Sequence, residues 1–139
     1  MDLILWRHAD AEGGAPDLAR RLTPEGHAQA ARVAAWLQPR LPADYRLLVS
    51  PALRAQQTAQ ALKKRFETVR ELAPGASADA IVRLAGNEGM AVLVGHQPDL
   101  GQAIACLLLG ELRDWAVDKG ALWWITGNRV KAVVSPDLL

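Results

Sequence analysis

The sequence contains little that is typical of secreted, membrane or nucleic-acid-binding proteins. It has 1 cysteine, Cys106, in 139 residues, so no disulfide can form within the chain and a reducing compartment, the cytoplasm, is expected. Its 16 basic and 15 acidic residues leave a net charge of +1, which gives no electrostatic reason to expect nucleic acid or an anionic membrane as a partner. The apolar run 3–6 is too short for a signal peptide, and the longest later run, 104–109, is too short to span a bilayer. We therefore expect a cytoplasmic protein with no nucleic-acid and no membrane partner.

What the chain does contain is an alternation of short apolar runs and helical patterns over the length of one ordinary domain. Runs rich in branched residues predict strands buried on both faces, and they are Leu3 to Trp6, Leu47 to Val49 and Ala91 to Val94. Strands that alternate with helices pair in parallel through right-handed crossovers. Two further strands, 122–126 and 130–134, joined at Gly127-Asn128, predict a terminal hairpin. The expected fold of residues 1–139 is a single three-layer α/β/α sandwich with a mostly parallel central sheet and a C-terminal antiparallel hairpin.

Capping residues indicate where the helices between these strands begin. Thr23-Pro24 and Ser50-Pro51 each offer an N-cap followed by proline at the first helical position, and Ser77 offers a third cap. The predicted helices span about 24–38, 51–66, 77–84 and 98–110.

Histidine and arginine residues follow the three predicted parallel strands. Arg7 and His8 follow the first strand, Arg54 comes shortly after the second, and His96 comes shortly after the third. Because ligands of open α/β sheets bind beyond the carboxyl ends of the strands, these side chains are expected to converge on one edge. Arg54 falls in the first turn of a helix, where the macrodipole disfavours a cation unless an anion is bound nearby. Since guanidinium groups match phosphate oxygens in pairs, the pattern predicts a phosphate pocket.

Three segments carry a family resemblance, and each follows a predicted strand. They are Arg7-His8-Ala9, residues 50–58 (Ser-Pro-Ala-Leu-Arg-Ala-Gln-Gln-Thr) and residues 95–98 (Gly-His-Gln-Pro). These segments resemble, in order, the motifs of the histidine phosphatase superfamily, whose fold is phosphoglycerate mutase-like. The SixA-type phosphohistidine phosphatases of this superfamily also place an Arg-x-Leu-Thr segment before the first helix, and here that segment is Arg20-Arg21-Leu22-Thr23. The resemblance covers essentially the whole chain.

The resemblance implies a phosphatase in which His8 attacks phosphorus in line and forms a phosphohistidine that water then hydrolyses. The attacking ring nitrogen must be unprotonated, and the neighbouring cations of Arg7 and Arg54 favour the neutral imidazole. These arginines would hold the phosphate oxygens, with His96 as a further hydrogen-bond donor. Neither a metal nor a cofactor is expected.

Two further roles follow from the same resemblance. A third phosphate-binding arginine is expected at Arg20 or Arg21, and the family register favours Arg20. A general acid for an alkoxide leaving group is expected at Glu71. Lesser options for this acid are Asp10, Glu12 and Asp99.

The substrate expected from these features is phosphohistidine on a signalling protein, such as a phosphotransfer domain. Imidazole leaves as a neutral ring when its distal nitrogen is protonated, and the chain has no long insertion to cover the site, which suits a side chain presented by another protein. The alternatives are a phosphatase of small phosphoesters, a phosphomutase and a non-catalytic phosphoprotein-binding module on the same fold. A metallohydrolase using His8, Asp10 and His96 is a further alternative, which the surrounding arginines disfavour.

Overall fold

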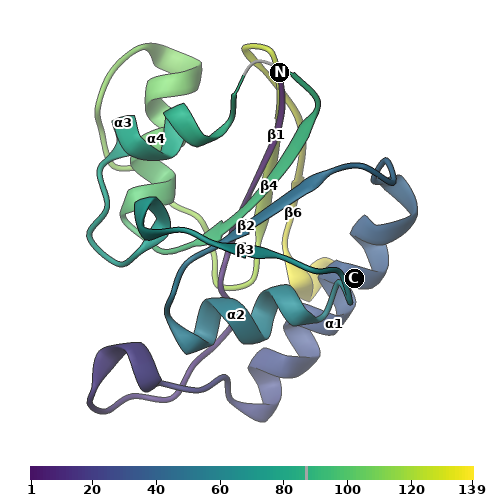
Figure 1. Ribbon diagram of the computed structural model, residues 1–139, viewed down its shortest axis with the longest axis vertical. Helices are drawn as coiled ribbons and strands as arrows, with labels where there is room; N and C mark the ends of the chain where they lie inside the picture. Colours follow the sequence, from purple (N-terminus) through teal and green to yellow (C-terminus); the bar gives the residue numbers. More distant parts are fainter. Residues whose placement is uncertain (87) are drawn as a thin grey trace.

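Figure 1 shows a central sheet between two groups of helices in the computed structural model, which describes residues 1–86 and 88–139. The sheet has six strands in the order β3-β2-β4-β1-β5-β6. The strands are β1 (Asp2–Arg7), β2 (Arg46–Val49), β3 (Glu67–Thr68), β4 (Met90–Gly95), β5 (Leu122–Thr126) and β6 (Arg129–Val134). The three predicted buried runs form β1, β2 and β4, which pair in parallel, while β5 and β6 form the predicted antiparallel hairpin. The predicted α/β sandwich is confirmed.

The helices cover both faces of the sheet because its inner strands are apolar on both sides. They are α1 (Pro24–Leu37), α2 (Leu53–Gln60), α3 (Ala78–Leu84) and α4 (Asp99–Leu109). On β1, Ile4 and Trp6 pack into the core shared with α1 and α2, whereas Leu3 and Leu5 pack into the core shared with α3 and α4. This alternation follows from the two-residue period of a strand. None of the described helices has both the length and the hydropathy needed to cross a membrane.

Two of the predicted N-caps are present. The hydroxyl of Thr23 accepts the N–H of Gly26 at 3.0 Å, and the hydroxyl of Ser77 accepts the N–H of Ala80 at 3.1 Å. Helix α4 ends at Leu109 and is capped by Gly110, whose left-handed backbone (φ 70°) costs glycine little.

Helix α2 is shorter than predicted at both ends. It begins at Leu53, because the backbone of Ala52 is extended (φ −67°, ψ 136°). It ends at Gln60 rather than near Phe66, and Lys63 then takes the chain through the left-handed region (φ 52°). The chain continues into β3, a strand that the sequence did not predict because its two residues are exposed and lack an apolar pattern.

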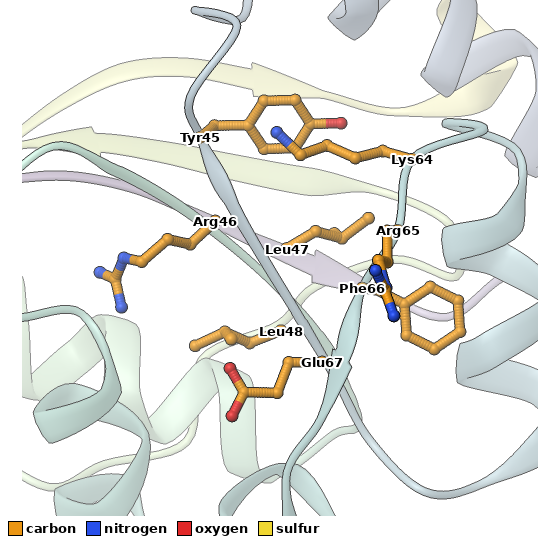
Figure 2. A pocket seen from close by; sticks show the side chains of 8 residues that line it. All are labelled: Tyr45, Arg46, Leu47, Leu48, Lys64, Arg65, Phe66 and Glu67. Atoms are coloured by element: carbon orange, nitrogen blue, oxygen red, sulfur yellow. The ribbon is translucent and has the colours of Figure 1, made fainter.

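A groove of about 430 Å³ lies at the β3 edge of the sheet, beside the amino end of β2. Figure 2 shows Lys64 lying over the ring of Tyr45 there, and its Nζ is 3.8 Å from the ring centroid. None of the predicted site residues lines this groove, because those residues follow the carboxyl ends of the strands.

The register of the parallel strands aligns their carboxyl ends. Arg7 pairs with Gly95, and Val49 pairs with Val94. The backbone N–H of His8 donates to the carbonyl of Gly95 at 3.0 Å, so the hydrogen bonding between β1 and β4 continues one residue beyond β1. The segments that follow β1, β2 and β4 therefore leave the sheet side by side.

Candidate active site

A pocket of about 200 Å³ lies beyond these carboxyl ends. Arg7 and His8 reach it from the end of β1, Arg20 from the loop before α1, Arg54 from α2, and His96 from the end of β4. The structure thus brings together five of the predicted site residues from four separate segments. The full lining is Arg7, His8, Ala11, Arg20, Arg54, Pro74, His96, Gln97 and Lys119.

The ring of His8 is held by its neighbour in the chain. Its Nδ1 lies 2.8 Å from the carbonyl oxygen of Ala9, and only 8% of the residue is exposed. A carbonyl oxygen accepts but cannot donate, so Nδ1 carries the proton and Nε2 of the neutral ring carries a lone pair. Nε2 is therefore the nitrogen of His8 that can act as a nucleophile.

Burial, more than the arginines, keeps His8 neutral. Burial is the largest cause, and together with the weaker effect of the Arg54, Arg7 and Arg20 cations it lowers the pKa of His8 to about 4, against the opposing hydrogen bond to Ala9. The sequence had pointed to the arginines alone.

His96 lies beside His8, with the ring centroids 5.1 Å apart and the planes at 55°. One phosphate group can contact both rings at this separation. His96 is 3% exposed, and burial, followed by the neighbouring His8 and Arg54, lowers its pKa to about 3. Its Nε2 lies 2.7 Å from the hydroxyl oxygen of Ser50. At neutral pH His96 is therefore uncharged.

The two motif arginines are anchored through their terminal nitrogens. Arg54 lies in the first turn of α2 with its side chain 5% exposed, and it donates to the backbone oxygen of Asp17 at 2.8 Å and to its carboxylate at 3.2 Å. Arg7 donates from Nη1 to the carbonyl of Val117 at 2.8 Å. These contacts fix the position of both guanidinium groups without neutralising Arg7.

The pocket concentrates buried polar atoms that lack partners. In the described part of the chain, four buried side-chain nitrogen or oxygen atoms have no hydrogen-bond partner, and three of them belong to this pocket: Arg7 Nε, Arg54 Nε and His96 Nδ1. Buried donors are nearly always paired in folded proteins. Two guanidinium groups beside an imidazole match the oxygens of a tetrahedral anion. The chemistry of these donors therefore suits a phosphate group.

The two candidate arginines are neighbours in the loop between β1 and α1, but their side chains lie in different places. Arg20 lines the pocket, and its Nε donates to the carbonyl of Glu12 at 2.6 Å. The side chain of Arg21 is 67% exposed and pairs at 3.5 Å with the carboxylate of Glu12. Arg20 is thus the arginine of this pair that can reach a ligand in the pocket.

Asp17 is a site residue that sequence reasoning missed. It lies on a short 3₁₀ turn and contacts both Arg20 and Arg54 through its carboxylate, each at 3.2 Å. Hydrogen bonds from Arg20 and then Arg54 lower the pKa of its carboxyl group. No sequence signal identified it, because it lies in a loop outside the three motifs.

Glu71 is not where the resemblance had led us to expect a general acid. It is exposed on the turn Arg70–Leu72, which buries Leu72 and leaves Glu71 beside Ala76 and Ser77 in a separate surface depression. A general acid must come within about 2.6–3.2 Å of the leaving atom. Glu71 does not line the pocket, so its position gives that role no support.

The lesser acid candidates are also engaged elsewhere. The carboxylate of Asp10 accepts from Thr23 at 2.7 Å and from Lys119 at 3.0 Å. Glu12 pairs with an arginine outside the pocket, and Asp99 is buried against backbone N–H groups. Among the described residues, no group of three or more His, Cys, Asp or Glu side chains is placed to hold a metal ion.

Gln97 supports the loop that carries His96. Its Nε2 donates to the carbonyl of Trp115 and its Oε1 accepts the N–H of Gly101, both at 2.7 Å. A Cβ at position 101 would lie 1.9 Å from that same carbonyl oxygen, so the close approach requires glycine. The third motif therefore positions His96 through packing as well as through the strand.

The pKa of His8 sets an expectation for the pH dependence of activity. Protonation at Nε2 removes the nucleophilic lone pair, so kcat/KM, which reports the free enzyme, is expected to fall only as the pH drops through about 4. Measuring kcat/KM for a phosphorylated substrate between about pH 3.5 and 8 tests this. A fall in kcat/KM near the ordinary histidine pKa would contradict it.

The fold must be monitored in the same experiment. His8 and His96 have lower pKa values folded than unfolded, so the unfolded chain binds more protons as the pH falls below about 6.5. The stability that the two histidines contribute is complete above about pH 6.5, and it is lost as the pH falls toward their pKa values in the folded protein. Tryptophan fluorescence at each pH separates loss of the nucleophile from acid unfolding.

The chain is similar to known proteins in sequence and in fold. The family model of the histidine phosphatase superfamily (branch 1) matches residues 3–79. Phosphohistidine phosphatase SixA of Escherichia coli (strain K12) is 33% identical over 123 residues, which cover 80% of this chain and 76% of that protein. A structure of the protein histidine phosphatase SixA complexed with tungstate superposes with a TM-score of 0.87 at 26% identity and covers 99% of each chain. A phosphoglycerate mutase from Thermus thermophilus shares the fold, with a TM-score of 0.69 at 23% identity over 97% of this chain and 99% of that one.

Proposed function

The chain belongs to the histidine phosphatase superfamily, and on that premise we propose that it removes phosphate from phosphohistidine on a signalling protein through a phosphohistidine intermediate on His8. One observation carries this proposal. The neutral ring of His8, with Nε2 unprotonated, belongs to a pocket that also contains the buried guanidinium group of Arg54, the partly buried one of Arg7, and His96.

In the first step, the lone pair of His8 Nε2 attacks phosphorus in line. The P–N bond to the substrate imidazole breaks, and the electron pair returns to that ring, which leaves neutral because its distal nitrogen keeps a proton. In the second step, water attacks the phosphorus of phospho-His8, one of its protons stays on the oxygen that is now bound to phosphorus, and the other passes to a phosphoryl oxygen of the departing phosphate. The P–Nε2 bond breaks and its electron pair restores the neutral ring, whose Nδ1 keeps its proton and donates it in the hydrogen bond to the carbonyl of Ala9.

The arginines and His96 supply charge stabilisation and orientation. Arg7, Arg20 and Arg54 come from three separate segments and can share the non-bridging oxygens of the transferring group. Because their positions are set by contacts with Val117 and Asp17, little reorganisation is needed as charge develops.

A preference for P–N over alkyl P–O bonds follows from the lining of the pocket. Among the described residues, none that lines it carries a carboxyl group. The nearby carboxyl groups of Asp10 and Asp17 have lowered pKa values, because hydrogen bonds from Thr23 and Lys119 stabilise the first and those from arginines stabilise the second. They are poor proton donors at neutral pH, so a leaving group that needs no general acid is favoured.

The expected result is a steep dependence on the leaving group. A histidine-phosphorylated phosphotransfer domain should exceed a serine-phosphorylated peptide in kcat/KM by at least about 100-fold, which is the usual contribution of a general acid. For a series of aryl phosphates, the rate should fall as the pKa of the phenol rises. Phosphate release measured under single-turnover conditions provides both comparisons.

Each alternative function has its own outcome in this panel. Equal rates on alkyl and P–N substrates would indicate a phosphatase of small phosphoesters, and exchange of phosphate between sugar positions would indicate a phosphomutase. Tight binding of the phosphorylated domain without release of phosphate would indicate a binding module.

The cytoplasmic location remains a prediction that rests on the single cysteine and the short apolar runs.

A further inference from the structure

Ser50 and His96 lie side by side because their strands are neighbours. Ser50 follows β2 directly, His96 follows β4, and the N–H of Ser50 donates to the carbonyl of Val94 at 3.0 Å. Ser50 has no exposed surface, and its hydroxyl oxygen lies 2.7 Å from Nε2 of His96. The hydroxyl also accepts the N–H of Ala52 at 3.1 Å.

From these contacts we infer that Ser50 is a positioning residue: its hydroxyl donates to Nε2 of His96 and so holds the ring in the tautomer that presents Nδ1–H to the phosphate. This inference rests on the proposed function for its catalytic consequence, but the tautomer itself is a property of the free protein.

Counting protons favours this direction of the hydrogen bond. If Nε2 of His96 carried the proton and donated to Ser50, the hydroxyl hydrogen would be buried without an acceptor among the described residues. Nδ1 would then place a lone pair, rather than a donor, beside an anion. With the hydroxyl as donor, Ser50 uses its hydrogen on Nε2 and an oxygen lone pair on Ala52.

The tautomer matters because His96 has only one proton to place. Its ring is neutral at physiological pH, with a pKa of about 3. Nδ1 is buried and has no partner within the described chain, so it is the ring atom left for a ligand. A neutral histidine donates through one nitrogen alone, and the group on the other nitrogen decides which one it is. His8 and His96 thus have the same tautomer, set by Ala9 in one case and Ser50 in the other, but they face the phosphate with opposite ring nitrogens.

Imidazole ¹⁵N chemical shifts of the free protein test the tautomer directly. In the wild type, Nδ1 of His96 is expected to have the shift of a protonated nitrogen and Nε2 that of a nitrogen lone pair. Ser50→Ala should move both shifts toward a mixture of tautomers, and Ser50→Thr, which keeps the hydroxyl, should restore the wild-type pattern. A wild-type His96 protonated at Nε2 would overturn the inference, whatever the activity of the protein.

A double-mutant cycle tests the consequence for turnover. Ser50→Ala is expected to lower kcat by about 10-fold or more, by analogy with the groups that orient metal-binding histidines. The same change in a His96→Ala background should have almost no further effect. An equal loss in both backgrounds would mean that Ser50 acts through the fold and not through His96.

The chain offers a matched control for the lost backbone contact. Ser77 also accepts a backbone N–H at 3.1 Å, from Ala80, but lies outside the pocket. Ser77→Ala should therefore leave kcat and the His96 shifts unchanged. Binding of tungstate, measured by calorimetry on each variant, tests the Nδ1–H donor of His96 without turnover. Ser50→Ala should weaken tungstate binding, and undiminished binding would contradict the inference.

Discussion

Replacing His8 by alanine is expected to reduce phosphatase turnover at least about 10⁴-fold, to the level that phosphate binding alone supports. The reason is the arrangement of lone pairs in the pocket. Nε2 of His8 has a lone pair that is available for attack, whereas Nε2 of His96 is occupied by its hydrogen bond with the hydroxyl of Ser50. Phosphate release from a histidine-phosphorylated protein measures the loss. Mixing wild-type protein with a phosphodonor should also leave an acid-labile label that the variant lacks.

Two controls separate loss of the nucleophile from loss of the fold. His27 is exposed on α1 outside the pocket, so His27→Ala should keep wild-type activity. His8→Asn retains an N–H that can reach the carbonyl of Ala9, and it should be as inactive as His8→Ala while unfolding at nearly the wild-type temperature. Near-wild-type turnover by either His8 variant would end the proposed mechanism.

Replacing Arg54 by alanine is expected to lower kcat/KM by about 10³-fold, which corresponds to about 4 kcal/mol of transition-state stabilisation. Arg54 is a buried cation in the first turn of α2, where an anion gains from the guanidinium and from the helix N-terminus together. The carboxylate of Asp17 compensates only part of this charge, because it is itself half exposed and shared with Arg20.

The matched control is Arg21→Ala, which removes an exposed arginine near the pocket. Its activity should stay within about twofold of the wild type, as expected for a surface ion pair of little energetic weight. Arg54→Lys should recover only part of the loss, since an ammonium group cannot bind two oxygens in the planar guanidinium geometry. Equal losses for Arg21→Ala and Arg54→Ala would show that net charge, and not the pocket, accounts for the effect.

Local patterns were sufficient for most of the fold. Branched apolar runs predicted β1, β2 and β4, and side-chain caps predicted the starts of α1 and α3. The errors lie where a nonlocal contact competes with a local signal. Ser50 looks like an N-cap, but its hydroxyl is used by His96, 46 residues away, and α2 begins later. β3 forms because β2 has a free edge beside it, which no pattern within its two residues reveals.

Residue patterns established the strands other than β3 and which histidines and arginines follow them. That was possible because apolar periodicity and motif spacing are properties of neighbouring residues. Folding in three dimensions was needed to place Arg20 in the pocket and Arg21 outside it, to join Asp17 to Arg20 and Arg54, and to leave Glu71 apart. It was also needed to set the protonation of both rings. Burial by distant segments keeps both rings neutral, and the tautomer of His96 depends on Ser50, 46 residues away, although that of His8 is set by the adjacent Ala9.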